Sequence, residues 1–363
     1  MRTNKLFYTV IVSLILLALV LGITACSKTT TTSTPAAQST TQATSTPVKE
    51  VLIRMTTPVP AGDEFVDWAQ AGMDKFNART GGAYKMQMFP GGQLGPFPES
   101  LDAIRTGAIE GGLIPLAAFG GTVPELGLAE LPFLYNNGEA NAYAELGIKE
   151  VYDQILQDKA NQRTLGCIFV GTLNILSAKK QVKTLEDLKG MIVGCDTPTS
   201  AELIKALGGS GIVVDFTEDY SSLQKGVIDA KTNAPQYTLV AKLYEVAKYY
   251  TVFHGLGSLY SFNINSDVYN KMPQNIKDAL NEEMGALAAD ISQKYVTKFY
   301  ELAPELQNLG VQYYYLPTEE RDRWKELAYP GTLDTLGKFG DTGAKIKQIV
   351  DEANAKYPYV QEK

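Results

Sequence analysis

Two kinds of hydrophobic pattern alternate along residues 51–265. Short apolar or period-two runs predict strands at 51–55, 84–89, 166–171 and 191–195. Apolar residues at helical spacing predict helices at 65–76, 101–106 and 200–207, and a glycine directly follows each of the last two. Strands that alternate with helices predict an α/β fold, in which helices cover both faces of open sheets.

One predicted helix is unusually long. It begins at Pro273, a residue suited to a first helical turn, and ends at Ala303, before Pro304. One face carries apolar residues at helical spacing: Ile276, Leu280, Leu287, Ile291 and Tyr295. At 1.5 Å per residue such a helix is about 45 Å long. We expect it to brace two lobes.

The N-terminus has the pattern of a secretory signal. Arg2 and Lys5 precede an apolar run over 6–23, and small residues follow it. The run ends in Leu-Gly-Ile-Thr-Ala-Cys at 21–26, which resembles the bacterial lipobox, whose cysteine receives diacylglycerol before cleavage. This resemblance implies a signal peptide over 1–25 and lipid on Cys26, which anchors the protein at the periplasmic or outer face of the membrane. The alternative is an uncleaved membrane anchor.

The segment 26–49 consists almost entirely of Thr, Ser, Ala, Gln and Pro after Cys26. This composition predicts a disordered tether. The remaining body exceeds the size at which one hydrophobic core usually keeps growing, so we expect two lobes. Loss of Arg2 and Lys5 with the signal changes the formal charge from −7 to −9. An acidic body with no basic cluster argues against nucleic acid as a partner.

Cysteine and histidine side chains could indicate an enzyme. Cys167 and Cys195 either form a disulfide or remain buried thiols, and their apolar surroundings in the sequence favour thiols. A secreted cysteine hydrolase is an alternative, with Cys195 as the thiolate and the single histidine, His254, as its base. No nucleophile motif surrounds either residue. No cysteine spacing indicates a metal site, and no glycine-rich loop indicates a phosphate cofactor. We therefore expect no enzyme, metal or cofactor.

Six segments in order resemble the solute-binding proteins of tripartite ATP-independent periplasmic (TRAP) transporters. They are 89–95 (FPGGQLG), 103–109 (AIRTGAI), 130–135 (ELPFLY), 183–190 (KTLEDLKG), 220–229 (YSSLQKGVID) and 265–273 (NSDVYNKMP). The resemblance implies a two-lobed periplasmic-binding-protein-like fold with a hinge and a long lobe-spanning helix. It assigns 50–172 and 259–299 to lobe I, and 173–258 and 300–363 to lobe II.

The resemblance also implies a function in transport. Such proteins close around a small solute and deliver it to a small and a large integral membrane subunit, which use an ion gradient for uptake. The alternative is a binding protein that serves an ATP-driven importer or a sensor, because such a protein would capture its solute between two lobes in the same way.

The usual carboxylate clamp of this family is missing here. Its arginine position, in the run 189–194, holds Gly194, and a second arginine position falls on Leu173 or Asn174. A carboxylate ligand would therefore need another cation, such as Arg54 or Arg105, or a metal ion. We expect that the solute, whether carboxylate, neutral or aromatic, is not held by an arginine–carboxylate clamp.

The resemblance places six residues near the ligand: Phe216, Asn233, Asp196, Asn174, Tyr237 and Tyr260. Phe216 is alternatively a core residue, and Asp196 is alternatively a helix N-cap. Aromatic rings are abundant enough to stack on a neutral or aromatic ligand. Asp196 or Asp215 opposite such rings would suit a cationic ligand.

Overall fold

The computed structural model describes residues 50–136, 142 and 145–360. The predicted signal peptide, Cys26 and the predicted tether lie outside the described residues. Among the residues described, no helix is both long and apolar enough for a membrane crossing.

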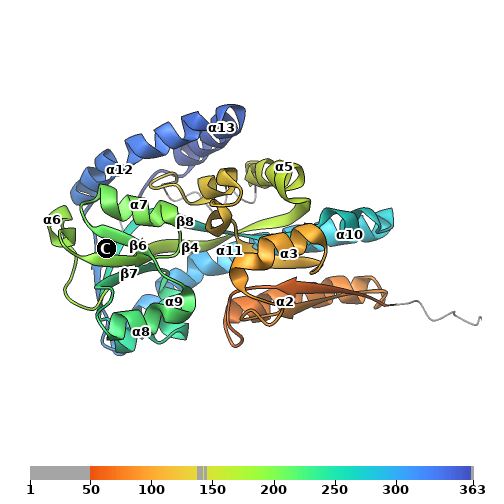
Figure 1. The fold of residues 1–363 in the computed structure, drawn as a ribbon, viewed down its shortest axis with the longest axis horizontal. Coiled ribbons are helices and arrows are strands. Elements are labelled where there is room, and N and C mark those ends of the chain that lie inside the picture. The colour runs from red at the N-terminus through yellow and green to blue at the C-terminus, as the bar shows by residue number, and fades with distance from the viewer. Residues whose placement is uncertain (1–49, 137–141, 143–144, 361–363) are drawn as a thin grey trace, which may run out of the picture. The chain divides into compact units, whose positions relative to one another are not determined.

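One mixed sheet of nine strands organises the body (Figure 1). Its order is β2-β1-β3-β8-β4-β7-β5-β6, and β9 pairs with β8. The strands are β1 (Val51–Thr56), β2 (Tyr84–Phe89), β3 (Gly111–Pro115), β4 (Gln162–Ser177), β5 (Ile192–Cys195), β6 (Ser210–Val213), β7 (Ala230–Asn233), β8 (Tyr249–Asn265) and β9 (Gln312–Tyr315). The predicted α/β class and the four predicted strands are confirmed, although β4 is much longer than the run 166–171.

The long strands β4 and β8 join two halves of this sheet. They pair antiparallel along almost their whole length, and the register shifts at three places, the middle one between Phe169 and Thr172. On one side of this shift, residues 260–264 of β8 pair with β3; on the other side, 174–177 of β4 pair with β7 and 249–252 of β8 pair with β9. Both halves therefore share a two-stranded connection, and Gly171 lies within it at a positive φ of 93°.

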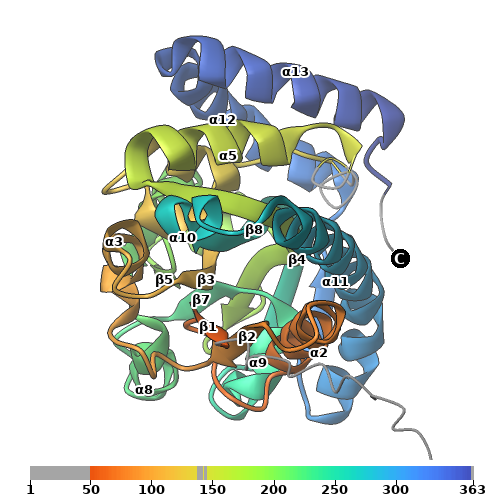
Figure 2. The ribbon, with the colours of Figure 1, turned by 90° about the vertical axis from the view of Figure 1, so that its right-hand side faces the viewer.

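Helices cover both sides of the sheet, with α5, α12 and α13 on one side and α2 and α9 on the other (Figure 2). The helices are α2 (Glu64–Arg79), α3 (Ser100–Thr106), α5 (Ile148–Ala160), α6 (Leu185–Leu188), α7 (Pro198–Ala206), α8 (Asp219–Gln224), α9 (Pro235–Val240), α10 (Ser266–Asn270), α11 (Gln274–Asn308), α12 (Thr318–Lys338) and α13 (Gly340–Lys356). The sequence predicts the end of α3 well, since Gly107 caps it in the left-handed conformation at φ 76°.

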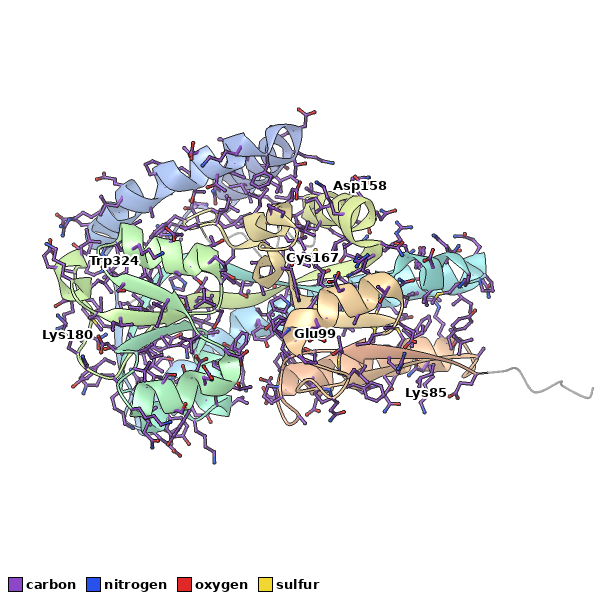
Figure 3. All side chains as sticks on the ribbon, viewed as in Figure 1. Lys85, Glu99, Asp158, Cys167, Lys180 and Trp324 are labelled. Atoms are coloured by element: carbon purple, nitrogen blue, oxygen red, sulfur yellow. The ribbon has the colours of Figure 1, made fainter. Side chains whose placement is uncertain are left out.

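The apolar core is divided into four clusters. Two clusters contain the buried residues of β1–β3, α2, α3 and α5, and two contain those of β5, β7, α7 and the first half of β8. Cys167 and Trp324, both labelled in Figure 3, belong to different halves. Helix α13 packs in the cluster of α5, so part of the segment 300–363 contacts residues assigned above to lobe I.

Helix α11 is longer than the sequence predicts, because it continues through Pro304 to Asn308. Proline removes one hydrogen bond and crowds the preceding turn. Here the turn is held by packing, since Leu302, Ala303 and Leu306 around the proline are buried. The 35 residues of the helix extend for about 52 Å. Its residues up to Tyr295 pack in the core of the first half, and Phe299 and Leu306 pack in a core of the second.

The two described cysteines are both free and buried, which confirms the thiol interpretation. Burial raises the pKa of each thiol to about 12.

Helix α11 packs closely on β4, and this contact leads to a prediction about stability. A Cβ at Gly166 would lie 2.6 Å from Ala288 Cβ and 3.0 Å from the Met284 carbonyl oxygen, whereas a Cβ at Gly285 of the same helix meets no atom within 4 Å. We expect Gly166→Ala to lower the free energy of unfolding by about 1–3 kcal/mol. Gly285→Ala is the matched control and should raise it by about 0.4–1 kcal/mol. Urea unfolding measures both, and equal effects would contradict the packing described.

Candidate ligand-binding site

A cavity of about 370 Å³ lies where the two halves of the sheet meet. Val170 and Leu173 of β4, with Ser258 and Tyr260 of β8, line it from either side of the register shift. Most of its remaining lining comes from segments that follow strand ends: Pro58–Pro60 and Asp63 after β1, Gly91 after β2, Ala118 after β3, Asp196 and Thr197 after β5, Phe216 and Thr217 after β6, and Ala234, Gln236 and Tyr237 after β7. Glu130, and Tyr295 of α11, also line the cavity.

The strand directions explain this position. Strands β1, β2 and β3 are parallel to one another, and so are β5, β6 and β7. In open α/β sheets, ligands bind outside the carboxyl ends of parallel strands, where loops and helix starts present polar groups. Because both sets end at the cavity, residues far apart in sequence converge there.

Aromatic rings form much of the cavity wall. Phe65 packs edge-to-face on Tyr260 and on Tyr295, with ring centroids 5.4 Å apart in each pair. Phe216 packs edge-to-face on Tyr237 at 5.6 Å, and the Tyr237 hydroxyl donates to the Phe216 carbonyl oxygen at 2.8 Å. All five rings line the same cavity. They provide apolar surface whose orientation is fixed before a ligand arrives.

A buried ionic cluster lies beneath the wall. The side chain of Lys231 is completely buried, and its Nζ lies 2.5 Å from Asp196 Oδ1 and 2.9 Å from Asp219 Oδ1. Burial alone would lower the pKa of Lys231, but the charges of the two aspartates outweigh burial and raise it. Burial raises the pKa of Asp219 to about 7, against the effect of Lys231. Lys231 is therefore the cation of the cluster, and its charge is already balanced by carboxylates.

Glu130 adds a third carboxyl group to this cluster. It is buried, lines the cavity, and accepts a hydrogen bond from Thr197 Oγ1 at 2.9 Å. Burial raises its pKa to about 8, and the nearby charge of Asp196 acts in the same direction. At neutral pH the Glu130 carboxyl group is mostly protonated.

Two amide side chains offer unused hydrogen-bonding groups. Asn233 Nδ2 donates to Thr238 Oγ1 at 2.8 Å, which fixes the amide and leaves the buried Oδ1 without a hydrogen-bond partner. Both polar atoms of the Gln236 side chain are also buried without a partner. Buried polar groups normally find partners. These amides are therefore placed to bind a ligand.

The structure brings five of the six predicted ligand residues together: Phe216, Asn233, Asp196, Tyr237 and Tyr260 line the cavity. Asn174 is not among the lining residues. Its Nδ2 donates to the Thr172 carbonyl oxygen, and its Oδ1 accepts from the backbone of Phe253 and His254, so the side chain stabilises the β4–β8 junction.

Asp196 is not the helix cap that the sequence also allowed. Thr197 caps α7, because its side chain accepts from the Ser200 backbone N–H, and Asp196 pairs with Lys231 instead.

The other cations considered lie outside the cavity. Arg54 forms a bidentate pair with Glu110, and Arg105 pairs with Asp102 on α3. Asp215 likewise does not line the cavity, since it caps the turn at Phe216–Glu218 by accepting from Thr217. Among the described residues, no group of three or more His, Cys, Asp or Glu side chains is arranged for a metal ion.

Lys231, Asp219, Glu130 and Gln236 are site residues that the sequence analysis missed. Gly194 and Lys231 are backbone neighbours on β5 and β7, and a Cβ at 194 would lie 3.3 Å from Lys231 Cδ and 2.7 Å from Ile228 Cδ1. The lysine stem therefore lies beside the position of the missing family arginine. A lysine in the otherwise uncharged run 230–234 was the available signal, and only its tertiary partners show its role.

The geometry does not assemble a cysteine hydrolase. Cys195 is buried with its Sγ directed to the Val193 carbonyl oxygen, and burial raises the thiol pKa to about 12, which disfavours the thiolate. His254 Nδ1 lies 2.9 Å from Thr172 Oγ1.

Comparisons with known proteins agree with this geometry. The profile of one family, the bacterial extracellular solute-binding proteins of family 7, matches residues 60–334. The C4-dicarboxylate-binding periplasmic protein DctP of Rhodobacter capsulatus is 28% identical over 281 residues, which are 75% of this chain and 83% of that protein. The uncharacterized protein YiiZ of Salmonella typhimurium is 31% identical over 176 residues, 48% of this chain, and the match spans about half (54%) of YiiZ.

A solved structure shows the same architecture. The TRAP periplasmic solute-binding protein of Pseudomonas putida F1, with bound D-glucuronate, has a TM-score of 0.73 and 25% identity, and the match covers 86% of this chain and 100% of that chain. The chain therefore belongs to family 7 of the bacterial extracellular solute-binding proteins and has their two-lobed fold. It is a solute-binding protein and not an enzyme.

The buried carboxyl group of Glu130 predicts a pH dependence of stability. Its pKa is about 8 in the folded protein and ordinary in the unfolded chain. Between these values the folded state holds an additional proton, so the free energy of unfolding falls as pH rises from about 5 to 8. Glu130→Gln should remove this part of the decline, which amounts to at most about 1.4 kcal/mol per unit of pKa displacement.

Urea unfolding at several pH values measures the decline. Glu125→Gln is the matched control, because pairing with Lys159 outweighs the effect of burial on Glu125 and lowers its pKa. The control should leave the decline in place. An unchanged decline in Glu130→Gln would contradict the assignment.

Proposed function

We propose that this protein captures a small organic solute in the cavity at the β4–β8 junction and delivers it to a TRAP-type secondary transporter. The observation that carries the proposal is the cavity itself, because both halves of the sheet contribute aromatic rings to it and Asn233 and Gln236 of the second half add unpartnered polar atoms. Delivery to a small and a large integral membrane subunit follows from the family, whose solved member with D-glucuronate is a TRAP protein.

Capture works as a shift between open and closed populations. A solute that contacts both lobes binds the closed form more tightly and therefore increases its share. Only two strands, β4 and β8, carry the sheet from one half to the other, and Gly171 interrupts their pairing. We place the hinge at this interruption, between lobe I (50–172 and 259–299) and lobe II (173–258 and 300–363).

The solute is held without an arginine clamp. No Arg, Lys or His lies among the described residues that line the cavity, and Lys231 is enclosed by its own carboxylates. Recognition rests instead on Asp196, Asn233 and Gln236, and on the ring pair of Phe216 and Tyr237. The relatives named above bind a C4-dicarboxylate and D-glucuronate. To bind a simple acid of that kind, Lys231 would have to lose its ion pair with Asp196. Breaking a buried ion pair costs several kcal/mol.

The experiment that tests capture is mass spectrometry of small molecules released when the freshly purified protein is denatured. We expect a stoichiometric small molecule. Phe216→Ala should lower the retained amount or affinity by about 10–100-fold, because a fixed ring is lost from the wall. Tyr300→Ala is the matched control, since that ring is 55% exposed on α11 outside the cavity. Equal retention by Phe216→Ala and the native protein would argue against this cavity.

We also propose that the mature protein is anchored by lipid on Cys26, after removal of residues 1–25. The support is the lipobox-like run 21–26 and the extracellular location of the family. Dual lipid chains give stable membrane attachment. Cys26→Ser should abolish incorporation of labelled fatty acid and leave the protein uncleaved or released. Cys195→Ser, at a buried thiol, is the control and should still be labelled. Labelling of Cys26→Ser would contradict the anchor.

A further inference from the structure

The charged groups of the cavity wall are all acidic. Asp63, Glu130 and Asp196 line it, and no basic side chain does among the residues that the structure describes. Asp63 is held by α2, which it caps by accepting from the Phe65 backbone N–H at 2.9 Å. A ligand in this cavity therefore meets carboxyl groups from three separate segments.

Lys231, the cation of the buried cluster, cannot serve an incoming acid directly. The Lys231 side chain has no exposed surface and does not line the cavity, because Asp196 and Asp219 enclose its ammonium group. With Glu130 counted, three carboxyl groups surround one ammonium group. The charge of Lys231 is therefore already balanced inside the protein.

The cavity wall also offers unused hydrogen-bond acceptors. Asn233 Oδ1 is buried and unpartnered, and Asp196 keeps one carboxylate oxygen beyond the pair with Lys231 in a side chain that is 14% exposed. Three hydroxyl donors of the wall are already used inside the protein: Thr197 donates to Glu130, Thr217 to Asp215, and Tyr237 to Phe216. A ligand that brings donors can bind to these acceptors, and the unpartnered Nε2 of Gln236 is left for an acceptor of the ligand.

The aromatic rings suit the same ligand. The faces of phenylalanine and tyrosine rings attract cations. Phe216 already lies 5.6 Å from the Lys231 ammonium group on its buried side, and Tyr237 packs against it. Five rings and three carboxyl groups thus line one cavity of about 370 Å³.

We propose, on the basis of the proposed capture function, that the solute carries a protonated amine, which Asp196, Glu130 and Asn233 Oδ1 bind as acceptors beside the Phe216 and Tyr237 rings. The class is that of small amines and amino acids. Any carboxylate on the solute lies away from this acidic part of the cavity.

Proton exchange distinguishes this ligand from an acid. The groups that face Glu130 are Asp196, Lys231 and the hydroxyls of Thr197 and Ser200. The charge of Glu130 also contributes to raising the pKa of Tyr260. Burial holds the pKa of Glu130 at about 8. A bound ammonium group lowers that pKa, so binding near neutral pH releases protons. A bound carboxylate would raise it and take protons up.

The test begins with equilibrium dialysis of the purified full-length protein, in detergent, against a defined equimolar mixture of amino acids, aliphatic and aromatic amines, and amine-free mono- and dicarboxylic acids. Mass spectrometry then identifies what the protein retains. Retention of compounds with an amine supports the proposal. Retention of amine-free acids alone overturns it and leaves the capture function intact. Retention of nothing contradicts the capture function, and the amine proposal falls with it.

Calorimetry with the best retained compound, in two buffers of different ionisation enthalpy, gives the number of protons exchanged. We expect release on binding, and uptake would overturn the proposal. Asp196→Asn should weaken an amine at least about tenfold, whereas it would strengthen an acid bound at Lys231. Asp102→Asn, on the exposed face of α3, is the matched control and should not change the affinity.

Discussion

The antiparallel pairing of β4 with β8 is the constraint on which the rest of the structure depends. These two strands alone carry the sheet from the half that contains β1–β3 to the half that contains β5–β7. Because each set of parallel strands points its carboxyl ends toward this junction, the cavity arises there. Helix α11 packs along β4 and contributes buried residues to a core on either side, which supports the two halves without closing the space between them.

The ionic cluster gives this cavity its own chemistry. Gly194, where the resemblance implies an arginine, lies beside the stem of Lys231. A lysine so enclosed is stable only with carboxylate partners, since an unpaired buried charge is very costly. Asp196 and Asp219 supply those partners, and Asp196 also lines the cavity.

Much of the fold was predictable from the sequence because it is encoded locally. Val51–Thr56 and Tyr84–Phe89 have strand patterns, and Gly107 provides the left-handed conformation that ends α3. The helix that passes Pro304 was predicted too short, because local rules give the cost of a proline but not the packing of Leu302 and Leu306 that compensates for it. Asn174, adjacent to a lining residue, is predicted near the ligand, and its side-chain hydrogen bonds lie within the β4–β8 junction.

The sequence by itself determined the α/β class, the order of the strands and helices, and the resemblance to the family. These features depend on residue types and on their spacing along the chain. Only the tertiary structure decided that Lys231 is enclosed by Asp196 and Asp219, that Glu130 joins them, and that Arg54 and Arg105 lie elsewhere. Charge interactions depend on distance and burial in space, and residues from separate strands acquire both only when the chain has folded.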